Sequence, residues 1–529
     1  MDQTKLYELL KNPKFYGPNV KSVKIIQTHI SYVALTGSFA YKVKKPVNFG
    51  FLDFSTLEKR KFFCEEELRL NKRLCPETYL DVLPITRKNN SFELNGKGEV
   101  VEYVLKMREF PQEKIMTNLL RQGKIDEEKI DHLCDILVGF YNSQTPPKEI
   151  TKYGELKVIK QNVDENFDQT KSFIDLTIPK RIYRNIKEAN TKLFERKKEI
   201  FSHRIKAGCI KDCHGDLHSG NIVITDDKIH IFDCIEFNKR FRFGDVASDI
   251  GFLAMDLDFL GHPYLSSYFI EKYVEKSGDT GIFDVLNFYK SYRAYVRGKV
   301  IGFKLNDTSI DKKEKQETIE TAKKYFDLSE YYALLFSRDL RKSKPILFIT
   351  SGLTGTGKTT VARKISIDYT AQVLSTDKIR KELEGIDKFE RHYDSYNTGL
   401  YSPDKMFYTY KKTLEKSDEF LKKGRNVVLD ATFKTKELRD MAFKIAKKND
   451  SIFVILFCDL PELHVKRYLQ DRVKKKSISD GRWEIYLKQK DTFEPPEKNE
   501  DLIMIDISKQ KYDYQIDVFR RILNKVNEG

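Results

Sequence analysis

A glycine-rich segment in the C-terminal part of the chain constrains the fold more than any other feature. Residues 352–359 read Gly-Leu-Thr-Gly-Thr-Gly-Lys-Thr, a complete GxxxxGK[ST] phosphate-binding loop. The apolar run 346–350 precedes this loop, and a helical pattern follows it. Strand–helix alternation then repeats toward the C-terminus. This context predicts an α/β domain with a central parallel sheet.

The positions of this loop and of the first helical turn predict an ATP site. Glycines let the backbone wrap a phosphate without side-chain clashes, while N–H groups and the helix N-terminus supply a positive field. Lys358 is expected to neutralise the β- and γ-phosphates, and Thr359 to hold Mg²⁺. The predicted nucleotide-binding positions are Gly352, Gly355, Gly357, Lys358, Thr359 and Thr360.

Charged residues follow at the ends of the next predicted strands. Asp377 ends the apolar run that begins at residue 373, and Arg380 lies one helical turn later. We expect Asp377 to take a proton from an acceptor hydroxyl, and Arg380 to bind a phosphate or another anion. Asp430 ends the apolar strand 426–430 and is placed to help hold Mg²⁺. The alternative is that Asp377 only caps a helix and Arg380 is solvated.

A predicted helix with arginines leads into a polar, lysine-rich segment. Arg467 and Arg472 precede the lysine cluster 474–476. This arrangement suits a lid that closes over the transferring phosphoryl group, and Arg472 is the arginine expected to act there. The lysine cluster could equally be a solvated face.

These motifs resemble the small P-loop kinases of the AAA type that phosphorylate hydroxyl groups. That group includes polynucleotide 5′-kinases, gluconate-type kinases and zeta-toxin-like kinases. The Asp-x-x-Arg pair at 377 and 380 is most similar to the polynucleotide 5′-kinase arrangement. The resemblance covers about 345–527 and implies a nucleic-acid 5′ end as the acceptor, with a sugar or other small metabolite next. An ATPase or GTPase that only hydrolyses is the alternative enzyme class.

A second set of catalytic residues lies upstream. Residues 214–221 read His-Gly-Asp-Leu-His-Ser-Gly-Asn, and Asp233 follows twelve residues after Asn221. This is the spacing of a kinase catalytic loop followed by a metal-binding aspartate. Asp216 is predicted to orient and deprotonate an acceptor hydroxyl, while Asn221 and Asp233 are predicted to hold Mg²⁺ on the ATP phosphates.

The His-Gly-Asp form resembles the aminoglycoside phosphotransferase and choline-kinase-like branch of the protein-kinase-like fold. The resemblance implies a bilobal α+β domain with a nucleotide-binding lysine in its small lobe. We choose Lys42 for that lysine, with Lys44 as the alternative on the same strand face. Glu66 is chosen as its carboxylate partner, with Glu67 nearly as plausible. Met107 is expected in the hinge that touches adenine.

The upstream region also departs from protein kinases. It has no GxGxxG in its first hairpin, no Asp-Phe-Gly and no Ala-Pro-Glu. These absences argue against a protein substrate and favour a small-molecule or RNA hydroxyl as the acceptor. The alternative is that this region is an inactive or regulatory partner of the P-loop half.

The length and charge of the chain fit two domains. The chain has 529 residues and a formal net charge of +16, which is compatible with nucleic acid or with a lysine-rich solvated surface. A polar segment ending at Pro345 predicts the domain boundary. We therefore expect a protein-kinase-like domain over 1–340 and a P-loop kinase domain over 345–529.

Several features predict a cytoplasmic protein without a membrane partner. The seven cysteines are an odd number with no CxxC pair, which indicates neither a disulfide framework nor a zinc site. The N-terminal residues lack the apolar core of a signal peptide. No run of 18 apolar residues occurs, so no membrane-spanning helix is expected.

Overall fold

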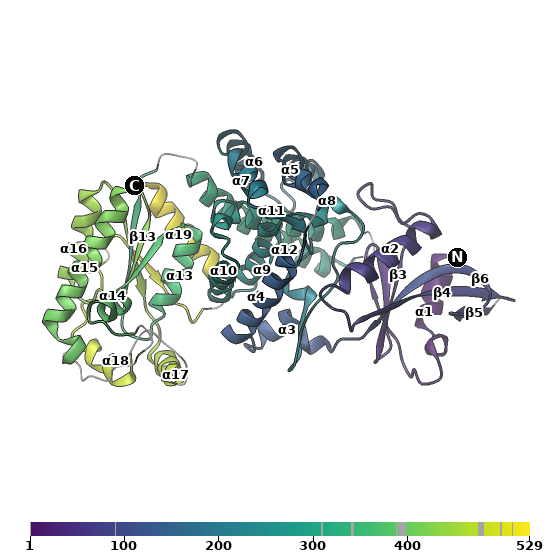
Figure 1. Cartoon of the computed structure of the whole chain (residues 1–529), viewed down its shortest axis with the longest axis horizontal. Coiled ribbons are helices and arrows are strands. Elements are labelled where there is room, and N and C mark those ends of the chain that lie inside the picture. The colour runs from purple at the N-terminus through teal and green to yellow at the C-terminus, as the bar shows by residue number, and fades with distance from the viewer. Residues whose placement is uncertain are drawn as a thin grey trace. The chain divides into compact units, whose positions relative to one another are not determined.

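A computed structural model describes most of the chain (Figure 1). The described residues are 2–89, 91–145, 147–307, 310–339, 343–387, 390, 398–473, 481–497, 500–509 and 512–528; for 339, 471–473 and 512–515 only the backbone is described. The chain divides into two compact units. The N-terminal unit comprises Met1–Val163, Glu199–Asp256 and Glu275–Gly278, and the C-terminal unit comprises Asp164–Lys198, Leu257–Val274 and Asp279–Gly529.

The N-terminal unit begins with an antiparallel sheet of six strands. In spatial order these are β1 (Lys24–Gln27), β2 (Ser31–Leu35), β3 (Phe39–Lys44), β6 (Glu99–Arg108), β4 (Tyr79–Lys88) and β5 (Ser91–Leu94). Successive side chains of a strand point to opposite faces. Tyr41 and Val43 of β3 enter the core that also holds Leu6 and Leu10 of α1 (Gln3–Lys11). Lys42 and Lys44 therefore lie on the other face.

Helix α2 (Leu57–Asn71) packs against β4 and β6 and faces those lysines. Thr56 caps it by accepting a hydrogen bond from the Lys59 N–H, and residues Arg60, Cys64, Glu67, Leu70 and Asn71 form its buried stripe. The stripe follows the three- and four-residue spacing of one helix face. The glutamate of this stripe, Glu67, lies opposite Lys42 and Lys44 of β3, which are its charged partners.

The rest of the N-terminal unit is helical, with two short strand pairs. One pair is β7 (Ile210–Asp212) with β10 (Phe243–Asp245), and the other is β8 (Ile222–Ile224) with β9 (Ile229–Ile231). The segment 213–221 leads from β7 into β8. The helices include α3 (Met116–Arg121), α4 (Glu127–Asn142), α7 (Glu199–Lys206), α8 (Lys239–Arg242) and most of α9 (Val246–Phe259). Helix α5 (Leu156–Thr170) begins in this unit and ends in the other.

The C-terminal unit contains a five-stranded parallel sheet. In spatial order the strands are β12 (Gln372–Ser375), β13 (Val427–Asp430), β11 (Ile346–Ser351), β14 (Ile452–Cys458) and β15 (Leu502–Ile505). Every residue of the central strand β11 is buried, as expected for a strand covered on both faces. The carboxyl ends of the parallel strands share one edge, where ligands bind in open α/β sheets.

Helices cover both faces of this sheet (Figure 1). Helices α15 (Pro403–Lys422) and α16 (Lys436–Lys448) lie on one face, and α13 (Lys358–Asp368) and α19 (Tyr512–Glu528) lie on the other. Three further helices of this domain are α14 (Thr376–Leu383), α17 (Glu462–Val473) and α18 (Trp483–Lys490). The fold is therefore an α/β P-loop fold, as the sequence predicts.

The C-terminal unit also contains helices that precede residue 340. These are α6 (Lys180–Arg196), α11 (Leu286–Gly302), α12 (Lys312–Asp339) and most of α10 (Pro263–Ser277). Buried polar contacts join them to α13: Tyr331 donates to Asp368 Oδ2 at 2.7 Å, and Asn287 donates to the Asp368 carbonyl at 3.0 Å. The strand–helix alternation begins at Ile346, whereas the C-terminal unit also contains residues before 346, in the ranges 164–198, 257–274 and from 279 onward. A separate domain over 345–529 remains a prediction.

None of the helices in the described part of the chain is long and apolar enough to cross a membrane.

Candidate active sites

The P-loop joins β11 to α13 through glycines with left-handed backbone. The φ angles of Gly352, Gly355 and Gly357 are 138°, 81° and 87°. A Cβ at Gly352 would lie 2.3 Å from the Cys458 carbonyl oxygen, and one at Gly357 would lie 2.2 Å from Ile507 Cδ1. The positive φ angles favour glycine at all three positions, and at Gly352 the backbone carbonyl of Cys458 also leaves no room for a side chain, which keeps the loop tight enough to follow a phosphate.

The lysine and threonine that end the loop lie beside Asp430. Thr359 Oγ1 donates to Asp430 Oδ2 at 2.8 Å, and Lys358 Nζ donates to the Leu353 carbonyl at 2.7 Å. Burial raises the pKa of Asp430, although the Thr359 hydrogen bond and the charge of Lys358 oppose this. A hydroxyl next to a carboxylate is a donor set that suits Mg²⁺. Thr360 follows in the first turn of α13.

Asp377 and Arg380 lie together in α14, which directly follows the neighbouring strand β12. Ser375, the last residue of β12, pairs with Asp430 of β13, so α14 starts at the same sheet edge as Asp430. Arg380 donates to Asp377 Oδ1 at 3.0 Å and stacks on the Tyr401 ring, 4.7 Å from its centroid. Arg380 is only 3% exposed, and within the described part of the chain its Nε has no hydrogen-bond partner.

The three carboxyl and amino groups at this edge influence one another. Asp377 raises the pKa of Asp430 and Lys358 lowers it, although burial is the larger cause of the shift. The charges of the predicted base, the predicted Mg²⁺ ligand and the loop lysine therefore act within one site. This clustering is what strand order β12-β13-β11 dictates.

Helices α17 and α18 pack against the outside of the loop. Val465, Leu469 and Tyr486 form a buried cluster against Leu353. Gln489 of α18 accepts a hydrogen bond from the Thr354 N–H at 2.9 Å. No sequence motif marks Gln489, because the contact depends on how α18 folds back.

Of the predicted lid arginines, only one has a described side chain. Arg467 is exposed on α17. The side chain of Arg472 and the lysine cluster 474–476 lie outside the described residues.

In the N-terminal unit, the catalytic-loop motif forms a compact hydrogen-bonded turn. Asn221 Nδ2 donates to Asp216 Oδ2 at 3.0 Å, and His218 Nε2 lies 3.5 Å from the same oxygen. The Asp216 N–H donates to His214 Nδ1 at 3.3 Å, while His214 Nε2 lies 3.0 Å from the Phe232 carbonyl. Because Nδ1 accepts, the proton of His214 resides on Nε2.

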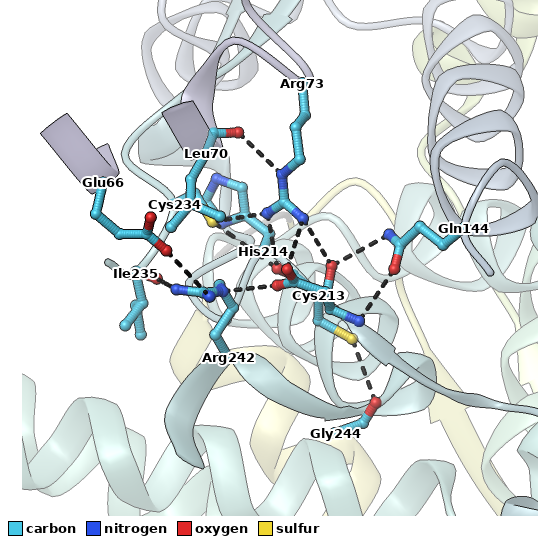
Figure 2. Close-up of polar contacts among 12 residues, drawn as sticks. Glu66, Leu70, Arg73, Gln144, Cys213, His214, Cys234, Ile235, Arg242 and Gly244 are labelled. Carbon is cyan, nitrogen blue, oxygen red and sulfur yellow. Dashed lines mark hydrogen bonds and ion pairs between the residues drawn. The ribbon is translucent and has the colours of Figure 1, made fainter. Parts of the chain in front are cut away.

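The base of this turn is held by the buried Asp249 and the half-buried Arg73 of the same unit. Asp249 accepts from the His214 N–H at 2.7 Å and the Gly215 N–H at 3.0 Å. Arg73 donates to the Asp212 carbonyl at 3.1 Å. It also donates to the Cys213 carbonyl at 3.3 Å (Figure 2). These bonds fix the backbone on which Asp216 stands.

Lys42 contacts two carboxylates. Its Nζ donates to Glu67 Oε1 and to Asp233 Oδ1, each at 2.7 Å. Burial lowers the pKa of Lys42, but the carboxylates of Asp233 and Glu67 outweigh it and hold that pKa well above its ordinary value. Asp233 has φ of 63°, a strained value for a non-glycine residue, and its N–H donates to Tyr79 Oη at 3.1 Å.

The glutamate that pairs with Lys42 is Glu67 rather than Glu66. One residue along a helix turns the side chain by about 100°, so only one of two neighbours can face β3. Glu66 instead contacts Arg69 at 2.7 Å and Arg242 at 3.5 Å, and Figure 2 shows it pointing toward Arg242. The spacing of Cys64 and Glu67 on the buried stripe is the sequence signal that favours Glu67.

Lys44 and Glu236 complete the charged cluster. Lys44 Nζ donates to Glu67 Oε2 at 2.6 Å and also to Glu236 Oε1. Burial raises the pKa of Glu236, with Lys44 opposing it. Glu236 was not predicted from the sequence, although it lies three residues after Asp233.

Met107 lies near the end of β6. It is paired with Ala40 of β3 and with Tyr79 of β4. It packs against a small buried cluster, which consists of Cys75, Tyr79 and Leu105. Phe232, the neighbour of Asp233 in the chain, packs against the same cluster.

Comparison with known proteins found a matching family model and similar solved structures. Residues 347–496 match the family model of the AAA domain. A gluconokinase from Sinorhizobium meliloti 1021 is similar over 35% of this chain and 94% of its own, with 19% identity and a TM-score of 0.25. A choline/ethanolamine kinase family protein from Mesorhizobium loti is similar over 62% of this chain and 98% of its own, with 11% identity and a TM-score of 0.35.

A relative at full-chain scale comes from mycobacteria. The uncharacterized protein Rv2004c of Mycobacterium tuberculosis (strain ATCC 25618 / H37Rv) is 30% identical over 436 residues, which are 82% of this chain and 83% of that protein. A match of 436 residues is longer than the region before residue 345, so it includes parts of both the upstream region and the P-loop region. The chain therefore belongs to the same family as Rv2004c.

Proposed function

We propose that the chain is an ATP-dependent phosphotransferase with two sites, each of which transfers the γ-phosphoryl group of ATP to a hydroxyl. The observation that carries the proposal is the same in both units. A phosphate-binding lysine stands beside groups that suit Mg²⁺: Lys42 bonds Asp233 at 2.7 Å, and the charge of Lys358 acts on Asp430, which bonds Thr359 at 2.8 Å. Mg²⁺, when bound, would neutralise charge on the transferring group.

In the P-loop site, each residue has a separate proposed role that depends on its position. The loop N–H groups and Lys358 hold the phosphates, while Thr359 and Asp430 are the residues that would hold Mg²⁺. Asp377 accepts the proton of the acceptor hydroxyl. Arg472 is the proposed lid arginine.

Arg380 suggests the class of acceptor for this site. It is 3% exposed, it contacts Asp377, and its Nε lacks a partner within the described residues. A buried guanidinium with an unused donor favours an anionic group on the acceptor. An enclosed donor suits a small hydroxyl-bearing metabolite with a phosphate, sulfate or carboxylate. A nucleic-acid 5′ end is the second candidate, favoured by the Asp-x-x-Arg spacing and the +16 net charge.

In the N-terminal site, Asp216 serves as the base and Asn221 and Asp233 would hold Mg²⁺. Lys42, held by Glu67, contacts the ATP phosphates, and Met107 lines the adenine position. The geometry that supports this is the Asn221–Asp216 hydrogen bond at 3.0 Å and the Lys42–Asp233 ion pair at 2.7 Å. A small-molecule or RNA hydroxyl is the proposed acceptor.

The P-loop proposal is tested by transfer of label from γ-labelled ATP. The acceptor panel contains sugars, anionic hydroxyl metabolites and oligonucleotides with 5′-hydroxyl ends. Lys358→Ala should lower transfer to the acceptor at least 100-fold, because the loop loses its phosphate-neutralising charge. Asp377→Asn should lower transfer while ATP binding persists. If Lys358→Ala transfers label as well as the wild type, the P-loop assignment is wrong.

The N-terminal proposal is tested with Asp216→Asn in the same assay extended to aminoglycosides. This variant should lose transfer to one set of acceptors that Lys358→Ala still phosphorylates. If Asp216→Asn changes neither transfer nor ATP turnover, the N-terminal unit is a regulatory or structural partner instead.

A further inference from the structure

Behind Lys42, a second lysine and a second glutamate are enclosed completely. The side chains of Lys44 and Glu236 are 1% and 5% exposed, and they form an ion pair with each other. Glu67, whose side chain is 0% exposed, uses Oε1 for Lys42 at 2.7 Å and Oε2 for Lys44 at 2.6 Å. The charges therefore alternate along a chain of contacts: Asp233, Lys42, Glu67, Lys44 and Glu236.

We infer that Lys44 and Glu236 are positioning residues of the N-terminal site. They fix Glu67, and Glu67 in turn holds the Lys42 ammonium where nucleotide phosphates can reach it. This inference rests on the proposed role of Lys42 in binding ATP.

The hydrogen-bond capacity of the groups supports this role. An ammonium has three N–H donors. Within the described residues, Glu67 and Asp233 use two donors of Lys42, so one remains for a phosphate oxygen. Lys44 orients Glu67 by binding Oε2, so that Oε1 is the oxygen that faces Lys42. Without Lys44, both oxygens of Glu67 could close on Lys42 and hold it away from phosphate.

Stability alone does not account for the pair. The Lys44 ammonium lies 4.8 Å from the centroid of the Phe54 ring, and its side chain is only 1% exposed. Replacing a buried ion pair with apolar side chains of similar size is often neutral or stabilising, whereas removing one partner is costly. A pair that adds little stability but fixes one oxygen of Glu67 fits a positioning role.

The two residues also lie close in sequence to the site they support. Lys44 follows Lys42 by two residues on the same face of β3, and Glu236 follows Asp233 by three residues. The pair therefore connects β3 to the segment that carries Asp233. Both ends of the contact chain are rigid, because β3 pairs with β2 and β6 and the Asp233 N–H is held by Tyr79.

The test compares stability with nucleotide affinity. All variants are made in full-length Lys358→Ala protein, so that binding of Mg²⁺ with a non-hydrolysable ATP analogue reports the N-terminal site. Lys44→Met should weaken the analogue about tenfold and lower Tm by about 5 °C or more, because Glu236 loses its partner. The double variant Lys44→Met with Glu236→Met should recover most of the Tm while its affinity stays about tenfold weaker.

A matched buried pair supplies the control. Lys290 and Asp258 of the C-terminal unit form an ion pair at 2.6 Å, with both side chains 1% exposed. Lys290→Met should also lower Tm, although by less because Asp258 keeps Lys364 at 3.6 Å and Tyr332 as partners, and it should leave analogue affinity within about twofold of the parent.

The outcomes separate the inference from the proposed function. If the double variant recovers affinity together with Tm, or if Lys44→Met binds the analogue like its parent, the positioning role is overturned. If Lys42→Ala also binds the analogue normally, the proposed ATP site itself fails. Should Lys44→Met not fold, the charge-balanced double variant decides alone, and parental affinity in it overturns the inference.

Discussion

At the scale of residues, the N-terminal site depends on groups that stay neutral as well as on charges. His214 is fully enclosed: its Nδ1 accepts from the Asp216 N–H, and its Nε2 faces the Phe232 carbonyl at 3.0 Å. Burial lowers the pKa of His214, although Asp249 and Asp216 oppose this. The neutral ring therefore holds the backbone of the predicted base, and a second proton would remove the acceptor that Asp216 uses.

The lowered pKa of His214 predicts a pH dependence of stability. The folded state binds a proton less readily than the unfolded state, whose histidine has the ordinary pKa of 6.5. The contribution of His214 is thus present above pH 6.5 and is lost as pH falls through the lower folded pKa. Urea unfolding between pH 7.5 and 5 should show this loss in the wild type. A His214→Asn variant should show a flatter profile, and an equally steep one would contradict the assignment.

The sequence indicates most of the candidate residues of both proposed sites because their motifs are local, and the catalytic roles of these residues stay predictions. Lys358, Thr359 and Asp216 lie within short runs whose spacing is set by one loop. The choice between Glu66 and Glu67 as the partner of Lys42 depends instead on which face of α2 packs toward β3. Glu236 depends on a contact between residues 192 positions apart. Periodicity can suggest such partners but cannot decide between neighbours.

At the scale of elements, α18 is tied to the P-loop by a side chain. Gln489 accepts from the Thr354 N–H at 2.9 Å, while Val465 and Leu469 of α17 pack against Leu353. A short helix gains most of its stability from tertiary contacts. The loop and the two helices therefore support each other.

Removing this tie should be visible in amide exchange. Gln489→Ala leaves the Thr354 N–H without its protein acceptor, so its exchange should accelerate about tenfold or more. Gln489→Glu keeps an acceptor oxygen at the same reach and should retain most of the protection. Equal exchange in all three proteins would show that the contact does not hold the loop.

The sequence predicts individual helices and strands better than it predicts the order of strands in a sheet or the packing of helices. The strand β11 is predicted from the apolar run that precedes the P-loop, and α13 from the helical pattern that follows it. The sheet order β1-β2-β3-β6-β4-β5 and the packing of α11 and α12 with α13 depend on contacts far apart in sequence. Local patterns carry no information on those contacts.

At the scale of the whole molecule, the P-loop sheet shares its core with earlier helices. Tyr331 donates to Asp368 at 2.7 Å and stacks on Phe519 with ring centroids 5.5 Å apart. Lys364 of α13 contacts Asp368 at 2.5 Å and Asp258 at 3.6 Å. The polar groups among these residues are buried, so the helices that cover them are part of what keeps the P-loop region folded.

Truncation tests this dependence. A fragment that starts at residue 345 exposes Asp368 and Lys364, and it should unfold at a lower temperature than a fragment that starts at 279 and retains α11 and α12. Equal Tm values for the two fragments would show that residues 345–529 fold independently.

The Tyr331 hydrogen bond can be tested in the full chain. Tyr331→Phe should lower the free energy of unfolding by about 1–3 kcal/mol, because a buried carboxylate loses a donor. The exposed Tyr408 supplies the control, since Tyr408→Phe should change the free energy of unfolding little.

The central claim is that one chain carries two separate ATP sites. The most direct test is the stoichiometry of binding of Mg²⁺ with a non-hydrolysable ATP analogue, measured by titration calorimetry. The account predicts two sites per wild-type chain, one in Lys358→Ala, one in Lys42→Ala and none in the double variant. A single site in the wild type, or a stoichiometry that neither substitution changes, would contradict it.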